Sequence, residues 1–484
     1  MRVSEYFNLG RSQPSLDFVD VDTEKDASVF IEPGAIRQLP DDWGAQCVDM
    51  LTSFFDSVLD AIRAGDHARI DDLVRGPLSE PDETHLGWSE GTSRGRGVGG
   101  KRAGLIISSL EKSKAARTGL LQDLEDSALF IEQIGPDIIS DITTNVCKGM
   151  LLAYTQSAAA RHGIPLEEVP SGPVWDPARR EWESGFTQLP MADTGRLLLV
   201  PKILVRYRQH LDRDEYYRRY LIPKLGEEEV MKPRSQLTQV LKSGEIRPSV
   251  SKLQARYPNR KEVLAEESSE RPEIFQRYKE HRRKAGTDPM THVEFTAEIG
   301  TERPDFDAML RKVEEIPPGQ EHASRYHLAV EELLTALFYP ALTSPRIEYP
   351  IHEGRKRIDI TYTNNARQGF FWWLGLHSIP CRYVAVECKN YQGDPANPEV
   401  DQLSSRFSPL RGQVGLLVCR TFKNRDLLMK RCRDTALDHR GYMLPVDDAD
   451  LRKMVFEARS EFTPVDARLP EFSLLKDRFD ALVS

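Results

Sequence analysis

Length, composition and charge set the first limits on this protein. With 484 residues, the chain exceeds what one hydrophobic core usually holds, so two or three domains are expected. Hydrophobic residues make up 39% and charged residues 29% of the chain, which excludes a protein that is disordered throughout. The formal net charge of -9 excludes a uniformly basic surface, although a local basic patch could still bind nucleic acid.

The sequence shows no membrane or export signal. No apolar run approaches the roughly 18 residues that a membrane helix needs, and residues 1–6 lack the basic start and apolar stretch of a secretory signal. The six cysteines form no C-x-x-C pair, which is typical of reduced thiols and excludes a thiolate zinc site. These features predict a cytoplasmic protein that does not bind membranes.

Residues 1–195 are predicted to form an N-terminal α+β region of unknown fold. A strand is expected at residues 16–21, and an amphipathic helix at residues 47–64, where the apolar side chains follow helical spacing. Further helices are expected at residues 102–121 and 140–162. The first two residues of the last helix, a serine and an aspartate, are expected to cap it.

Two stretches of this region are expected to interrupt its helices and strands. Residues 91–100 are rich in glycine, serine and arginine and predict a loop, and the prolines within residues 170–181 predict a break between subdomains. Residues 95–101 fit the pattern G-x-x-x-x-G-K. However, Arg102 replaces the Ser or Thr that would hold Mg²⁺, and no strand precedes the pattern, so a phosphate-binding loop is not expected.

Residues 196–320 are predicted to form a polar, mostly helical middle region. It opens with a short apolar strand at residues 197–201, and residues 207–284 are rich in arginine, lysine and tyrosine. Such a stretch could follow a phosphate backbone, but the acidic residues between the basic ones favour a solvated surface. Residues 317–319, Pro-Pro-Gly, are the clearest linker signal and place the last domain boundary there.

Residues 321–484 are predicted to form an α/β domain around a central mixed sheet, because helical and strand patterns alternate. The aromatic residues 370–373 are expected to pack in its core, with a platform for base stacking as the alternative. The expected helices are residues 324–338, 367–376, 399–407, 425–437 and a last one from residue 450, and the expected strands are residues 346–351, 357–362, 383–387, 414–419 and 442–446.

The strand that ends in Glu387-Cys388-Lys389 is the most informative segment. Because side chains alternate along a strand, Glu387 and Lys389 leave it on the same side. Opposite charges at the end of an apolar strand are costly to bury unless they find partners or a ligand. The preceding strand carries Asp359 between two β-branched residues. If the two strands are neighbours, the two carboxylates converge.

Two convergent carboxylates beside a lysine form an oxygen site suited to Mg²⁺ or Mn²⁺. Such a metal polarises a phosphoryl oxygen and lowers the pKa of a bound water, and Lys389 could orient that water or neutralise charge on the phosphate. No G-x-S-x-G or H-E-x-x-H motif competes with this site. The alternative interpretation of the same residues is a salt-bridge cluster at the edge of the sheet.

These residues resemble the PD-(D/E)XK phosphodiesterase superfamily, the restriction-endonuclease-like fold, in its Mrr-like, phage-defence form. The resemblance covers residues 324–455 and rests on the strand Arg-Ile-Asp-Ile at residues 357–360, on Glu-Cys-Lys-Asn-Tyr at residues 387–391 and on the order of the elements. Ile358 stands where the name of the superfamily puts proline.

The resemblance implies a set of site residues. Glu331 matches a glutamate that many members carry on the first helix, and Gln402 matches a glutamine on the helix after the third strand. Many members have tyrosine where this chain has Arg406. For all of these helical residues, an ordinary exposed position is the alternative. The implied catalytic residues are Asp359, Glu387, Lys389, Glu331 and Gln402, and the implied metal ligands are Asp359, Glu387 and the backbone carbonyl of Cys388.

Together these features predict a metal-dependent endonuclease that hydrolyses phosphodiester bonds of nucleic acid, and the resemblance implies a role in defence against phage or foreign DNA. DNA is the expected substrate, with RNA as the alternative. The N-terminal region is expected to sense, recruit or regulate, through a homo-oligomer or an activating partner. The alternative function is a nucleic-acid-binding or regulatory assembly protein that retains a gated or vestigial nuclease fold.

Overall fold

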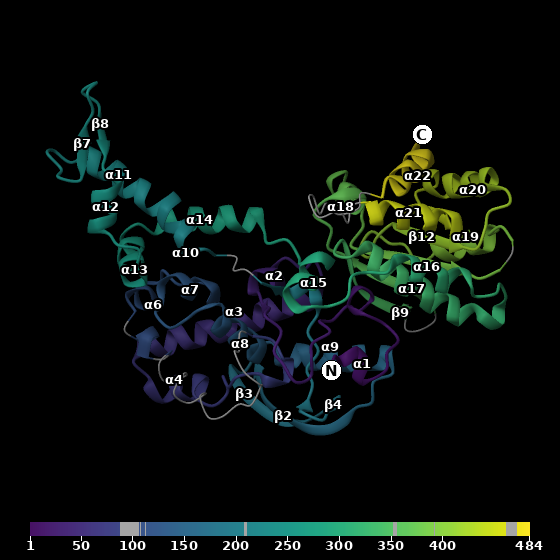
Figure 1. Ribbon diagram of the computed structural model, residues 1–484, viewed down its shortest axis with the longest axis horizontal. Helices are drawn as coiled ribbons and strands as arrows, with labels where there is room; N and C mark the ends of the chain where they lie inside the picture. Colours follow the sequence, from purple (N-terminus) through teal and green to yellow (C-terminus); the bar gives the residue numbers. More distant parts are fainter. Residues whose placement is uncertain are drawn as a thin grey trace.

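The computed structural model describes residues 1–87, 106, 108–111, 113–207, 211–351, 356–391, 393–460 and 472–484. Its buried apolar side chains form two clusters. One runs from Val3 to Phe295 and includes Tyr339, and the other runs from Phe306 to Leu482. Figure 1 shows the two corresponding bodies, the first in purple to teal and the second in green to yellow. The domain boundaries predicted at residues 195 and 320 stay predictions.

The first body begins with helices packed around α3 and ends with short hairpins (Figure 1). Its elements up to residue 206 are α1 Val3–Tyr6, η1 Gln13–Ser15, β1 Phe30–Ile31, α2 Pro33–Arg37, α3 Asp42–Ala64, α4 His67–Val74, η2 Asp82–Thr84, α6 Lys114–Thr118, η3 Leu124–Asp126, α7 Ser127–Phe130, α8 Pro136–Val146, α9 Lys148–His162, β2 Glu167–Asp176, β3 Glu181–Leu189, β4 Met191–Ala192, β5 Gly195–Arg196, η4 Lys202–Leu204 and β6 Val205–Arg206.

Helix α3 confirms the predicted amphipathic helix and starts five residues before it. The start is fixed by Asp41, whose side chain accepts a hydrogen bond from the backbone N–H of Gly44 and thereby satisfies a free donor of the first turn. The end is fixed by Gly65, whose left-handed φ of 66° costs glycine less than a residue with a side chain. The apolar stripe between these two ends is buried in the first cluster.

Both strands predicted in this region, at residues 16–21 and 197–201, are wrong. The two segments lie side by side and are buried, but they share only one isolated bridge, Phe18 with Pro201. The backbone N–H of Val19 donates to the carbonyl of Val200 at 2.9 Å. A short apolar run indicates burial, and it does not distinguish a ladder of strand pairs from an extended segment that pairs at one point.

The helix predicted over residues 140–162 is two helices, α8 and α9, which meet at Cys147. Helix α8 begins four residues earlier, with Pro136 at its first position, a place where the missing N–H of proline costs nothing. The predicted cap is therefore wrong. Ser140 lies inside α8 and accepts a hydrogen bond from the backbone N–H of Ile31, while Thr144 donates to the carbonyl of Ser140 at 2.8 Å.

Three further predictions for this region have different outcomes. The helix predicted over residues 102–121 is confirmed in part: residues 106 and 108–111 are helical, α6 covers Lys114–Thr118, and Gly119 ends it with a left-handed φ of 81°, while residues 102–105, 107 and 112 lie outside the described residues. The break predicted at residues 170–181 is wrong, since this stretch belongs to the hairpin of β2 and β3. A two-stranded sheet leaves an unpaired edge on each strand, where proline is tolerated. The loop predicted at residues 91–100 and the pattern at residues 95–101 lie outside the described residues.

The middle section confirms the predicted helices and adds a hairpin that was not predicted. Tyr216, Phe275 and Tyr278 are buried in the first cluster, so this section has more apolar surface than its composition indicates. In Figure 1 it extends away from the helices around α3 and returns through α14. Its elements are α10 Arg213–Tyr216, η5 Tyr217–Leu221, α11 Ile222–Met231, β7 Thr238–Val240, β8 Ile246–Pro248, α12 Val250–Arg256, α13 Lys261–Glu270, α14 Pro272–Ala285, α15 His292–Ile299 and α16 Phe306–Glu314.

The C-terminal body is an α/β domain with a five-stranded mixed sheet, which confirms the predicted order of elements. The strand order is β13-β12-β11-β10-β9; the pairs of β10 are antiparallel, and β11, β12 and β13 are parallel. The elements are η6 Gln320–His322, α17 Ala323–Phe338, β9 Leu342–Ile351, β10 Lys356–Asn364, α18 Gly369–Leu376, β11 Tyr383–Lys389, α19 Asn397–Ser404, β12 Val414–Cys419, α20 Arg425–Leu437, β13 Tyr442–Asp447, α21 Asp448–Ser460 and α22 Ser473–Val483.

Different helices cover the two faces of this sheet. On one face, the hydroxyl of Tyr362 donates to the backbone carbonyl of Glu331 in α17 at 3.2 Å. On the other face, the ring of Phe407, just after α19, lies so close to Gly415 that a Cβ there would come within 2.9 Å of it. The aromatic segment predicted for the core divides, because Phe370 and Phe371 are buried and Trp372 is exposed.

No helix among the described residues combines the length and the apolar character that a bilayer crossing requires. The two bodies touch where Lys202 lies against Tyr339. Its Nζ is 4.0 Å from the centre of the tyrosine ring and donates to the backbone carbonyl of Pro14 at 2.9 Å. Burial lowers the pKa of this lysine to about 7, although the charges of Asp17 and Glu331 oppose the shift.

The first prediction concerns this lysine. Between about pH 7 and pH 10 the unfolded chain holds a proton on Lys202 that the folded chain has released, so the free energy of unfolding should rise with pH. Lys202→Met should remove this part of the rise. Urea unfolding of both proteins at several pH values in this window measures it. Parallel curves for the two proteins would contradict the shifted pKa.

Candidate functional site

Asp359 of β10 and Glu387 of β11 lie next to each other on one face of the sheet. Ile360 of β10 pairs with Val386 of β11, and this is the final pair of the ladder between the two strands. Asp359 and Glu387 occupy the next position on each strand. Because alternate residues of a strand share a face, both acids lie on the face opposite to α17. Directly opposed side chains on antiparallel strands have their Cβ atoms about 5 Å apart, so the two carboxylates are neighbours.

Glu387 is the buried centre of this arrangement, with 0% of its surface exposed. Its Oε1 accepts hydrogen bonds from Nζ of Lys389 at 2.8 Å and from Nε2 of Gln402. Its Oε2 is buried without a hydrogen-bond partner among the described residues. Burial raises the pKa of Glu387, the charge of Asp359 adds to the rise, and the charges of Lys389 and Arg406 oppose it. The site therefore favours an additional positive charge.

Gln402 holds the lysine and the glutamate together. Its amide nitrogen donates to Glu387, and its Oε1 accepts a hydrogen bond from Nζ of Lys389 at 3.3 Å. The two contacts also fix the orientation of the amide group, because the donor and the acceptor face different partners. Helix α19 thus places Gln402 over the end of β11, where the sequence predicted it.

Asp359 is less buried and is held by the backbone. Its Oδ2 accepts a hydrogen bond from the backbone N–H of Cys388 at 2.9 Å. Nε2 of His327 in α17 lies 3.9 Å from the same oxygen and 3.2 Å from the carbonyl oxygen of Cys388. This histidine was not predicted as a site residue from the sequence. It precedes Glu331 by four residues and so shares a helix face with it, a spacing that could have pointed to it.

Glu331 is separate from this group. Its Oε2 lies 2.5 Å from Nη2 of Arg11, and its Oε1 accepts a hydrogen bond from Oγ1 of Thr335 at 2.9 Å. Helix α17 covers the face of the sheet that carries Tyr362, whereas Asp359 and Glu387 lie on the opposite face. With 1% of its surface exposed, Glu331 is also not the solvated residue that was the alternative.

The donors available for a metal are few. Among the described residues, no three His, Cys, Asp or Glu side chains gather in a way that could hold a metal ion. Asp359 and Glu387 supply two carboxylates. Oε2 of Glu387 is buried, has no hydrogen-bond partner among the described residues, and is free to bind a metal ion. The backbone carbonyl of Cys388 already has His327 beside it. This set fits Mg²⁺, which keeps several waters and usually binds one or two carboxylates.

The salt-bridge interpretation explains only part of the site. Lys389 and Glu387 do form an ion pair at 2.8 Å. The pair supplies one positive charge for two neighbouring carboxylates and leaves one oxygen of Glu387 buried and unpaired. A buried anionic oxygen without a partner is costly. A further cation at the site would reduce this cost.

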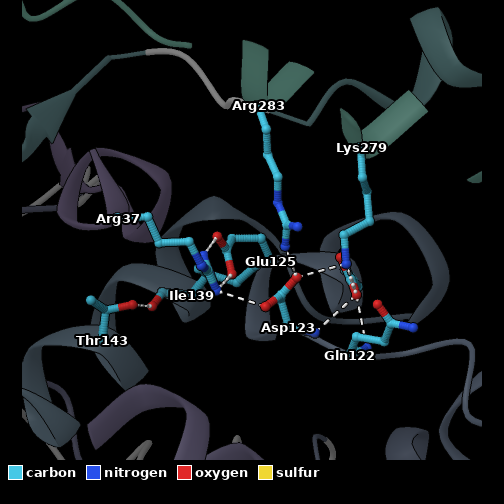
Figure 2. A network of polar contacts seen from close by, with 9 residues as sticks. Arg37, Gln122, Asp123, Glu125, Ile139, Thr143, Lys279 and Arg283 are labelled. Carbon is cyan, nitrogen blue, oxygen red and sulfur yellow. Dashed lines mark hydrogen bonds and ion pairs between the residues drawn. The ribbon is translucent and has the colours of Figure 1, made fainter. Parts of the chain in front are cut away.

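A second polar cluster in the first body was not predicted from the sequence. Figure 2 shows Asp123 between Arg37, Lys279 and Arg283, with Nη2 of Arg37 at 3.0 Å and Nζ of Lys279 at 2.6 Å. Glu125 pairs with Arg37 as well. These residues line a cavity of about 380 Å³. Asp126, which pairs with Lys279 at 2.8 Å, is the third acid of the cluster, so three acids face three bases among the described residues. We therefore interpret the cluster as the tie between α14 and the helices around α3.

The comparisons with known proteins concern only the first part of the chain. Residues 8–212 match a family model described as "Domain of unknown function (DUF8370)". Neither the curated proteins nor the solved structures contain a match to the chain. The matched range includes Arg11 and ends before α17, so it does not include the acids of the C-terminal domain.

The second prediction concerns the contact between the two bodies at Arg11. Arg11→Met should lower the free energy of unfolding by about 3 kcal/mol, because it leaves the buried carboxylate of Glu331 without its partner. Glu331→Gln in addition should recover part of the loss, since the amide carries no charge. Urea unfolding of the two single variants and the double variant measures the coupling. Additive losses would show that the pair does not interact.

Proposed function

We propose that this protein is a metal-dependent endonuclease that hydrolyses phosphodiester bonds, with DNA as its substrate. The observation that carries the proposal is the juxtaposition of Asp359 and Glu387 on one face of the sheet, with one oxygen of Glu387 buried and free. A lysine and a glutamine complete the arrangement. The resemblance of the same residues to the PD-(D/E)XK superfamily supports this reaction and suggests a role in defence against phage or foreign DNA.

In this proposal Asp359 and Glu387 hold Mg²⁺ or Mn²⁺. When bound, the ion would supply a Lewis acid for the phosphoryl oxygens and a water with a lowered pKa. Hydrolysis adds the oxygen of water to phosphorus, breaks one ester bond and delivers a proton to the departing oxygen. Nζ of Lys389 lies 2.8 Å from Oε1 of Glu387 and can donate to the charge that builds on the phosphate.

Gln402 and Glu331 have supporting roles in the proposal. Gln402 positions the lysine, because its Oε1 accepts from Nζ and prevents the ammonium group from turning entirely toward Glu387. Glu331 anchors Arg11 and the first body to α17, and α17 also carries His327 beside Asp359. Neither residue needs to touch the phosphate to affect the rate, because small displacements of catalytic groups are costly.

The third prediction tests the reaction. Asp359→Asn, Glu387→Gln and Lys389→Ala should each reduce cleavage of plasmid DNA in Mg²⁺ or Mn²⁺ by at least about a hundredfold, because each removes a group that acts on the metal or the phosphate. Agarose gels of timed reactions measure the loss, and EDTA should abolish cleavage by the unmodified protein.

Asp401→Asn is the matched control for these variants. Asp401 is an exposed acid on α19, next to Gln402, and its carboxylate accepts a hydrogen bond from Nη1 of Arg440 at 2.8 Å. Its loss should leave cleavage within about twofold, as expected for an exposed position. If the unmodified protein and all four variants cut at the same rate, cleavage does not originate at this site. Circular dichroism of each variant separates loss of activity from loss of fold.

One observation favours a second candidate, a nuclease that its first body keeps inactive or a regulatory assembly protein with the same fold. Arg11 reaches Glu331, and Lys312, beside it, pairs with Glu332 and lies 3.4 Å from the carbonyl of Gly10. The N-terminal segment is thus held against the first helix of the domain that carries the acids. An activating partner could act by loosening this contact.

The fourth prediction concerns this contact. The fragment of residues 303–484 contains the whole second cluster and is expected to fold. If the first body restrains the site, the fragment should cut DNA at least about tenfold faster than the full chain, a change of about 1.4 kcal/mol in the barrier. The fragment with Asp359→Asn is the control. A folded fragment that is no faster than the full chain would argue against the restraint.

A further inference from the structure

A second cavity lies on the same face of the sheet as the two acids. It has a volume of about 270 Å³ and is lined by β9, β10 and β11 and by the segment that follows α19. Thr361, two residues from Asp359, and Ala385, two residues from Glu387, contribute to its floor. Two residues span about 7 Å along a strand. The cavity therefore begins next to the candidate site, and one substrate chain could occupy both.

The wall of the cavity is built by residues 406–412. Arg406 lies one helical turn beyond Gln402, so this wall continues from the helix that covers Glu387. The segment closes on itself through hydrogen bonds between the backbones of Ser408 and Gly412. Gly412 has a φ of 144° and touches the strand, because a Cβ there would come within 2.3 Å of the carbonyl oxygen of Tyr383. The wall is thus held in place by backbone contacts.

The charge of this cavity is strongly positive. Its lining includes Arg346, Arg382, Arg406 and Arg411, and among the described residues Asp42 is the only acid that lines it. Asp42, from the start of α3, pairs with Arg382 at 2.8 Å. The structure gives the other three arginines no ion pair within 4.0 Å among the described residues; Arg346 lies over the ring of Tyr349, and Arg411 donates to the backbone carbonyl of Arg406. An anion could contact several of these arginines at once.

Three buried polar atoms of this lining have no hydrogen-bond partner among the described residues. They are Oγ1 of Thr361, Nε of Arg382 and Nε of Arg406. Only 8% of the surface of Arg406 is exposed. The positive charge of this arginine opposes the rise in the pKa of Glu387 that burial causes. Buried donors are almost always paired in folded proteins, so three free ones in one cavity indicate a ligand with acceptor oxygens.

We propose that this cavity binds one nucleotide of the substrate strand next to the cleaved bond, with its phosphate on Arg406 and Arg411. The rings of Tyr349 and Tyr383 also line the cavity and offer a surface for the base. Guanidinium groups suit phosphate because they donate two parallel hydrogen bonds. This inference rests on the proposed function, and it gives Arg406 a role at the position where the related nucleases often have tyrosine.

Binding can be measured separately from cleavage. The full chain is titrated, in EDTA, into a short fluorescein-labelled single-stranded DNA, and fluorescence anisotropy reports the affinity at several salt concentrations. Arg411→Gln and Arg346→Gln should each weaken binding by about tenfold, which corresponds to about 1.4 kcal/mol. Each should also reduce the slope of log affinity against log salt by about 0.7, the value for one lost phosphate contact on a single strand.

Arg406→Met is expected to have the largest effect, and because this residue is buried its fold is checked by circular dichroism. Arg433→Gln is the matched control. Arg433 is an exposed arginine on α20 that contacts only the backbone carbonyl of Ala481, so its loss removes the same charge outside the cavity. Unlabelled dTMP should compete with the DNA more strongly than inorganic phosphate does, since the cavity also has rings for a base.

Each outcome bears on the inference. Weaker binding by Arg411→Gln and Arg346→Gln, with normal binding by Arg433→Gln, supports it. Equal binding by all variants, or equal weakening by the control, overturns it. Competition by inorganic phosphate as strong as that by dTMP overturns the part that concerns the base. If DNA binds through the cavity but neither Mg²⁺ nor Mn²⁺ leads to cleavage, the binding inference stands and the proposed nuclease activity fails. If the unmodified protein and Arg411→Gln bind and cut DNA alike, the nuclease activity stands and the binding inference fails.

Discussion

The C-terminal domain is organised around the burial of one carboxylate beside another. Glu387 has no exposed surface, and Asp359 lies on the same face of the neighbouring strand. Two acids in such a position repel each other, and desolvation adds to the cost. The surrounding residues compensate in part: Lys389 pairs with Glu387, Gln402 bridges the two, and Arg406 contributes its charge from the next turn. The arrangement costs stability, which is typical of functional sites.

The sequence predicted this domain well because two of its patterns are unambiguous. Buried parallel strands such as Val414–Cys419 form short apolar runs, and the helices between them have clear polar starts. The charges at the end of an apolar strand need partners or a ligand, and the structure meets this need by placing the two strands side by side so that the acids are neighbours. This pattern predicts Asp359, Glu387 and Lys389, whereas Gln402 is implied only by the resemblance to the PD-(D/E)XK superfamily; the structure brings the four side chains together.

The features that the sequence did not predict depend on distant contacts. Arg11 and Glu331 are far apart in the chain, and no local pattern pairs them. The same is true of Asp123 and Lys279, which join a helix of the middle section to the first body. In the N-terminal region the sequence predicts strands where the structure has buried extended segments, because burial and pairing give the same apolar signal. Tertiary context decides such cases.

The pair of Asp42 with Arg382 connects the two bodies at the rim of the arginine-lined cavity. An anion that occupied the cavity would compete with Asp42 for this guanidinium, so occupancy and the attachment of α3 are thermodynamically linked. By reciprocity, a change that separates α3 from the sheet would free Arg382 and increase the affinity of the cavity for the anion. The first body could in this way sense whether the cavity is filled without approaching the acids itself.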